Sequence, residues 1–230
     1  MNMSKRWLMA IGLMLPLLAD DRSQQTLSST QTAHFQVTAA GAIRLENSFG
    51  EVDIQGWDRP EVDVTVVRST EHSYTAQDPV AQRRLDSVQV ASKQEGNDVV
   101  ITTTYPPRGL FLHPLSRRSD VEIRYQIRAP RASKLIIQHN RGGVNVTDVR
   151  GDIHATVTNG QIDVTLIPGS YAIDAESKLG QVYSDFEGHG HGRHLIGDQF
   201  TGRGATPSAN LYLRVRYGDI LILKQTGPAD

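Results

Sequence analysis

Residues 142–186 read GGVNVTDVRGDIHATVTNGQIDVTLIPGSYAIDAESKLGQVYSDF and carry a glycine at a nearly fixed step. Three intervals of nine residues and one of eleven separate Gly142, Gly151, Gly160, Gly169 and Gly180. After each glycine the second, fourth and often the sixth residues are apolar or small, and those between are mostly polar. A period of two places alternate side chains on opposite faces of a strand. The stretch therefore predicts short β-strands, each with one apolar and one polar face.

These strands must stack, because one short strand cannot bury its apolar face alone. Glycine suits the turn at each step, where a positive φ or a close backbone approach is needed. A β-solenoid would make the strands of one face parallel, whereas an antiparallel meander or sandwich would reverse them. The regular glycine spacing favours the solenoid, and the Asn159-Gly160 pair favours a local hairpin. We predict an all-β repeat domain that is β-solenoid-like, with the meander or sandwich as the alternative.

The glycine-led pattern extends to both sides of this stretch. Gly41, Gly50 and Gly218 precede the apolar pairs Ile43/Leu45, Val52/Ile54 and Ile220/Ile222. Alternating apolar residues also occur at 35–37, 62–66, 88–90, 99–103, 121–127, 135–137 and 211–215. We predict a single β-repeat domain over residues 34–225.

The register of the repeat is specified by its apolar residues. Ile162 and Val164 are expected in the core, and Gln161 and Asp163 on the outer face. A slip of one residue would exchange the two sets of side chains.

One segment interrupts the strand rhythm. Asp78 and Pro79 precede Val80–Leu85, which predicts a short helix with Asp78 as N-cap and Pro79 at its first position. Farther along, Pro106–Arg118 is predicted to be a loop with an apolar tip at Leu110–Leu112, which we expect to fold back onto the core.

The N-terminus has the composition of a secretory signal peptide. Lys5 and Arg6 provide a basic start, and the apolar run Trp7–Leu18 is too short to span a bilayer. We expect residues 1–19 to be a signal peptide that is cleaved after Ala19, which leaves no transmembrane span.

Charge and composition exclude several classes of function. Removing Lys5 and Arg6 from the 24 basic residues leaves 22 against 25 acidic ones, a formal net charge of −3. The chain thus lacks the basic excess expected of a nucleic-acid-binding protein. It has no cysteine, so no disulfide supports it. The polar residues 20–33 predict a flexible leader, and residues 226–230 a tail.

The assembled pattern resembles the "putative adhesin" family of bacterial exported proteins, a domain of unknown function. The motifs that carry the resemblance are Gly50-x-Val52-x-Ile54-x-Gly56-Trp57-Asp58, Val62-x-Val64, Val121-x-Ile123-x-Tyr125-x-Ile127-x-x-Pro130, the glycine-led rungs at Asn159 and Ser177, and Tyr217-Gly218-Asp219-Ile220. The resemblance covers roughly residues 35–225. It implies a β-helix-like domain outside the cytoplasm and supplies no catalytic residues.

A histidine cluster is the candidate metal site. His189, His191 and His194 lie among glycines, and imidazoles so close in sequence can share a zinc or copper ion. Additional ligands nearby would be Asp185, Glu187 and Asp198. A structural zinc site usually needs four ligands, and the chain has no cysteine to contribute. We expect a solvated, flexible loop without a tight metal site.

A catalytic triad of Asp152, His154 and Ser170 is disfavoured by spacing. Two residues apart on one strand face, Asp152 and His154 would lie about 6.5–7 Å apart, too far for the carboxylate to orient the imidazole. No G-x-S-x-G elbow surrounds the serine. We predict no catalytic residues.

Dispersed acids make a polysaccharide-cleaving enzyme the weaker alternative. The outward carboxylates are Asp53, Asp63, Asp152, Asp163 and Asp219. A glycosidase needs two carboxyl groups within about 5–10 Å. On its own face Asp163 is expected to neighbour Asn145 rather than a second acid.

The sequence therefore predicts a non-enzymatic, exported scaffold or binding module of the cell envelope, either periplasmic or at the cell surface. Its expected partner is an envelope protein or a glycan, and no cofactor is expected. The alternatives are a polysaccharide-acting β-helix enzyme and a periplasmic metal-binding module built on residues 189–194.

Overall fold

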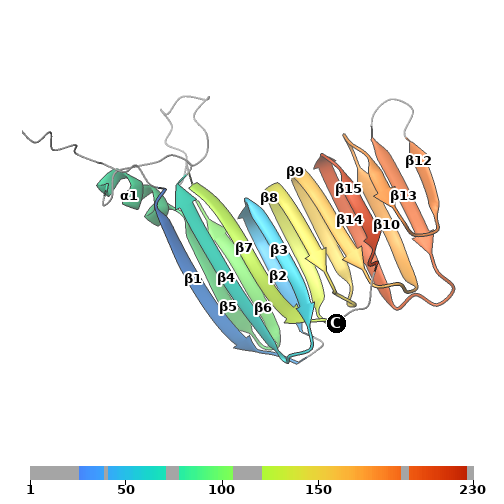
Figure 1. Ribbon diagram of the computed structural model, residues 1–230, viewed down its shortest axis with the longest axis horizontal. Helices are drawn as coiled ribbons and strands as arrows, with labels where there is room; N and C mark the ends of the chain where they lie inside the picture. Colours follow the sequence, from blue (N-terminus) through green and yellow to red (C-terminus); the bar gives the residue numbers. More distant parts are fainter. Residues whose placement is uncertain (1–25, 39–40, 71–77, 106–120, 193–196, 227–230) are drawn as a thin grey trace, which may run out of the picture.

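The computed structural model describes residues 26–38, 41–70, 78–105, 121–192 and 197–226. This part of the chain forms fifteen strands and one helix (Figure 1). Their bounds are β1 Ser28–Gln36, β2 Ala42–Phe49, β3 Glu51–Trp57, β4 Glu61–Thr70, α1 Pro79–Ser87, β5 Gln89–Glu95, β6 Asp98–Thr104, β7 Val121–Pro130, β8 Lys134–Thr147, β9 Ile153–Leu166, β10 Tyr171–Ser177, β11 Val182–Ser184, β12 His189–Gly192, β13 Asp198–Arg203, β14 Ala209–Tyr217 and β15 Ile220–Lys224.

Two layers of strands enclose the core, and β8 and β9 run through both. The first half of β9 pairs with β14 and its second half with β15, in both cases parallel. β8 pairs in the same way with β2 and then β3. Layer one is ordered β5-β6-β2-β8-β9-β14-β10-β13-β12, and layer two β1-β4-β7-β3-β8-β9-β15-β11.

Neighbours in space are not always neighbours in sequence. β2 lies between β6 and β8, and β14 lies between β9 and β10. Antiparallel strands flank the parallel centre: β4 and β1 beyond β7, and β13 and β12 beyond β10. The all-β prediction is confirmed. We call each stretch of chain that passes from a strand of layer one to a strand of layer two a coil. These coils do not stack in chain order, as those of a simple solenoid would. Antiparallel pairing is confined to the flanks.

The inward side chains of both layers form one apolar core. Ile162 and Val164 are fully buried, as the glycine-stepped register predicts. On the outer face, Gln161 Nε2 donates to the Asp163 carboxylate at 2.7 Å. Between the layers, Thr103 Oγ1 on β6 lies 2.6 Å from the Tyr125 hydroxyl on β7. These buried hydroxyls satisfy each other inside an otherwise apolar interior.

A ladder of glycines forms the corner where each coil passes from layer one to layer two. In spatial order its members are Gly50, Gly142, Gly160, Gly218 and Gly180, and all five have a positive φ. A Cβ on Gly160 would lie 1.8 Å from the Gly142 carbonyl oxygen, and one on Gly218 would lie 1.9 Å from that of Gly160. Only glycine has both the conformation and the space that this stack requires.

The corner also changes which residues face inward. In β9 the buried residues are Ile153, Ala155 and Val157 before the corner and Ile162, Val164 and Leu166 after it. The hairpin suggested by Asn159-Gly160 is therefore wrong. The chain does not reverse there but continues as β9, with Gly160 paired in parallel with Gly142 of β8.

A buried row of side chains lies just before the glycine ladder. Its members, from strand to strand, are Ser48, His139, Val157, Val215 and Ser177. His139 is 2% exposed, and its Nδ1 lies 2.8 Å from Ser48 Oγ. Burial lowers the pKa of His139 to about 4, so the ring is neutral at pH 7.

The segments outside the coils agree with the sequence in part. The helix is confirmed: Asp78 Oδ1 accepts a hydrogen bond from Val80 N, and Pro79 begins α1. Strand β1 begins at Ser28, whereas the leader was expected to extend to residue 33, because backbone pairing with β4 extends beyond the apolar pattern. The predicted loop tip at Leu110–Leu112 and the predicted signal peptide lie outside the described residues. No helix among the described residues is long and apolar enough to cross a membrane.

Replacing Gly160 with alanine should destabilise the fold by about 2–4 kcal/mol, because the new methyl group would meet backbone that cannot move aside. Gly190→Ala is the matched control, since nothing lies within 4 Å of a Cβ at that position. Urea denaturation of both variants measures the difference. Equal free energies of unfolding would contradict the ladder.

His139 should make the fold sensitive to acid. The unfolded chain takes up this proton near pH 6.5 and the folded chain only near pH 4. Stability from this residue is therefore complete above pH 6.5 and falls as the pH drops to 4, by about 3 kcal/mol. His139→Val introduces the residue type of Val157, which pairs with position 139 on the neighbouring strand. This variant should lose less of its free energy of unfolding between pH 6.5 and pH 4. Urea denaturation at several pH values measures this difference. If the free energy of unfolding falls by the same amount in the wild type and in His139→Val, this account is refuted.

Candidate functional site

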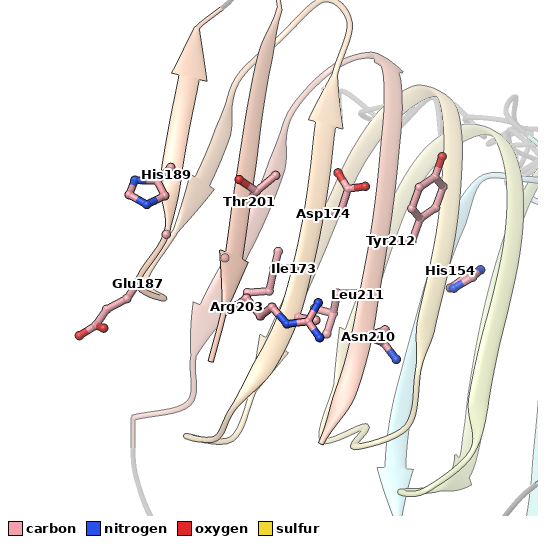
Figure 2. Close-up of a pocket in the computed structure, with 13 residues that line it drawn as sticks. His154, Ile173, Asp174, Glu187, His189, Thr201, Arg203, Asn210, Leu211 and Tyr212 are labelled. Atoms are coloured by element: carbon pink, nitrogen blue, oxygen red, sulfur yellow. The ribbon is translucent and has the colours of Figure 1, made fainter. Parts of the chain in front are cut away.

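A depression of about 840 Å³, lined by both polar and apolar groups, lies on the outer surface of layer one, over β9, β14, β10, β13 and β12. We call it the C-terminal outer face. The residues that line it include His154, Asp174, Arg203, Asn210 and Tyr212. Figure 2 shows these side chains on neighbouring strands, with Tyr212, Asp174 and Thr201 at a similar level.

The strand register places these side chains side by side. Inward positions of β14 are Ala209, Leu211, Leu213 and Val215, so Asn210, Tyr212 and Arg214 must point outward. Tyr212 pairs with His154 on one side and with Asp174 on the other, and Asp174 pairs in turn with Thr201. Residues distant in sequence thus form one row across rigid strands.

Arg214 contacts two members of this row, Tyr212 and Asp174. Its guanidinium carbon lies 3.8 Å from the centre of the Tyr212 ring, and its Nη2 donates to Asp174 Oδ2 at 2.7 Å. Nε is 3.7 Å from a carboxylate oxygen of Glu176. The His154 ring centre lies 5.5 Å from that of Tyr212. The tyrosine is thereby held between a cation and an imidazole, with 41% of its surface exposed.

The floor and rim of the depression differ in character. Small residues, Ala172 and Gly202, line it between the larger side chains of β13 and β14. On one rim Asn210 Nδ2 donates to Asp152 Oδ1 at 3.1 Å. On another rim stands Arg203, whose guanidinium makes no ion pair with the described residues. The depression therefore offers one cation, one amide side chain and an aromatic edge to a ligand.

The structure does not assemble the triad of Asp152, His154 and Ser170. Ser170 is not on the strand next to His154, because β14 lies between β9 and β10. Two strand spacings of about 4.8 Å separate the serine from the histidine. Ser170 Oγ is buried beside Gly204, where a Cβ would lie 2.1 Å from it. The absence of catalytic residues stays a prediction.

The histidine cluster is only partly described. His189 and His191 stand two residues apart on β12, both exposed, and His194 lies outside the described residues. No group of three or more His, Asp or Glu side chains that could hold a metal occurs in the described part of the chain. His189 instead borders the C-terminal outer face opposite Thr201.

The outward acids Asp53, Asp63 and Asp163 of layer two have neutral or histidine partners. Asp163 pairs with Asn145, as expected, and Asn145 Nδ2 donates to Asp53 at 3.5 Å. A second depression, of about 430 Å³, includes Asp53 and Asp63. Asp63 Oδ1 lies 2.5 Å from His34 Nδ1. Each of these two carboxylates is thus engaged by another side chain.

Sequence reasoning missed Tyr212, Arg214, Asn210 and Asp174 as a group. Their proximity depends on β14 lying between β9 and β10, which no local pattern reveals. The strict alternation of residues 209–217 did show which side chains face outward.

No family model matches the chain, and no curated protein matches it. Solved structures with some similarity include a "putative cell adhesion protein" from Clostridium sporogenes, at 10% identity and a TM-score of 0.47 over 87% of this chain and 100% of that one. Others are a "putative adhesin" from Bacteroides fragilis (8%, TM-score 0.26, 85% and 97%) and a "putative lipid binding protein" from Parabacteroides distasonis (8%, TM-score 0.27, 86% and 97%). These TM-scores lie below 0.5, so no function is transferred from them.

The two described histidines of β12 should not form a tight zinc site. Two imidazoles on an exposed strand leave half of a tetrahedral shell to water. Calorimetric titration with zinc should show weak binding or none, unchanged by His191→Ala. A stoichiometric nanomolar site that disappears in His191→Ala would mean that further ligands complete it.

Proposed function

We propose that this protein is a non-enzymatic binding module exported to the cell envelope, and that it binds a glycan at the C-terminal outer face. The export proposal rests on the basic and apolar residues 5–18. The binding proposal rests on one observation: a depression of mixed polar and apolar lining on paired strands, with Tyr212 at its edge beside Arg214.

The chemistry of the depression suits a hydroxyl-rich ligand. Sugar hydroxyls both donate and accept hydrogen bonds, and planar polar groups such as those of Asn210 and Arg203 match them. The exposed part of the Tyr212 ring supplies apolar contact together with a hydroxyl group. Because β9, β14 and β10 pair through their backbones, these groups are positioned before a ligand arrives.

Binding is favoured over catalysis by the state of the acids. Of the two acids that line the depression, Asp174 and Glu187, the Asp174 carboxylate is in an ion pair with Arg214, which leaves no pair of free carboxylates. A general acid and a nucleophile must instead reach the reacting bond together.

Screening the protein on an array of bacterial envelope glycans tests the proposal. Tyr212→Ala should weaken binding at least about tenfold, and Asn210→Ala should also weaken it. Tyr183→Ala is the matched control, because Tyr183 is another exposed tyrosine, on β11 of layer two. Tyr212→Ala and Tyr183→Ala should each change the free energy of unfolding by no more than about 0.5 kcal/mol.

Two results would count against this function. Glycan binding that survives Tyr212→Ala but is lost in Tyr183→Ala would move the site to layer two. Cleavage of an array glycan would favour the polysaccharide-acting enzyme.

A further inference from the structure

Within the described part of the chain the two layers have four edge strands, and β1 differs from the other three. Edge strands are usually protected by shortness, charge, proline or a bulge. β11 has three residues and β12 has four. β5 carries Lys93 and Glu95, which form an ion pair at 2.6 Å. β1 has none of these devices: its nine residues read SSTQTAHFQ, and its register against β4 is unbroken.

The open side of β1 is formed by its even-numbered residues. Thr70 N donates to Leu27 O, and Val37 N donates to Pro60 O, so odd-numbered residues direct their backbone groups toward β4. Their even-numbered neighbours must direct theirs away. Gln36 O agrees with this, because it accepts from the side chain of Gln94 rather than from β4. The N–H and C=O groups of Thr30, Thr32 and His34 therefore point away from β4, to an edge on which no described strand pairs.

We propose that β1 pairs antiparallel with β1 of a second copy of this chain, on a two-fold axis at Thr32. This register places Thr32 opposite itself, Thr30 opposite His34, and Ser29 opposite Phe35. Opposed threonines are favourable cross-strand neighbours, and no like charges meet because β1 has no acidic or basic side chain apart from His34. The His34 ring is already engaged by Asp63 at 2.5 Å.

A second copy fits this edge better than an unrelated strand. Antiparallel self-pairing satisfies the same backbone groups on both molecules and closes after two copies, so it does not propagate into a fibre. It would also extend layer two as one continuous sheet across the dimer. The C-terminal outer face lies at the opposite end of the molecule, near β12, and stays open in each copy (Figure 1).

Single-cysteine crosslinking in the full chain tests the register, since the protein has no cysteine of its own. In the proposed dimer the two Thr32 Cα atoms lie about 5.5 Å apart, within reach of a disulfide. The two Thr30 Cα atoms lie about 14 Å apart, beyond that reach. Under mild oxidation Thr32→Cys should form covalent dimers, whereas the equally exposed control Thr30→Cys should not.

Sedimentation of the chain without cysteines tests the association itself. The wild type and Thr32→Asn should sediment as dimers, and Thr32→Asp as a monomer that dimerises again at high salt, because two carboxylates would meet at the axis. A monomeric wild type, or equal crosslinking of the two cysteine variants, would overturn the proposal. Neither outcome bears on glycan binding, which uses residues at the other end.

Discussion

The positive-φ glycine ladder at the corner is the constraint on which the rest of the structure depends. Each glycine lies against the carbonyl of the next coil, so five coils share one bend at one height. That alignment keeps the strands in register, with Gly142 opposite Gly160. It also changes the inward-facing parity, which lets a single strand such as β9 line the core from both layers. A side chain at any rung would push two coils apart.

Much of this could be predicted from sequence because the information is local. Alternation set the inward face of every coil, Asp78 and Pro79 marked the start of α1, and Ile162 and Val164 are buried as expected. The all-β class followed directly. The Asn159-Gly160 pair suggested a hairpin that is not formed. A glycine with positive φ suits both a hairpin and a corner, and only its neighbours in space distinguish the two.

The candidate site could not be predicted because it depends on strand order. His154 and Asp174 lie on the two strands that flank β14. Arg214 of β14 contacts Asp174 although the two residues are 40 positions apart in the sequence. Asp152 and His154 drew attention for a triad, yet Asp152 is bound by Asn210 and His154 lies against Tyr212. Asp152 and His154 therefore contact residues of β14 instead of forming the triad considered from sequence.

The insertion of β14 between β9 and β10 has a consequence for how the chain folds. Synthesis proceeds from the N-terminus, so β10 is complete before β14 exists. If β10 docked early on the free edge of β9, it would have to detach before the native sheet could form. Such non-local pairing is slow because the intervening chain must be ordered first. Maturation of the C-terminal coils should therefore be the late step in reaching the native state.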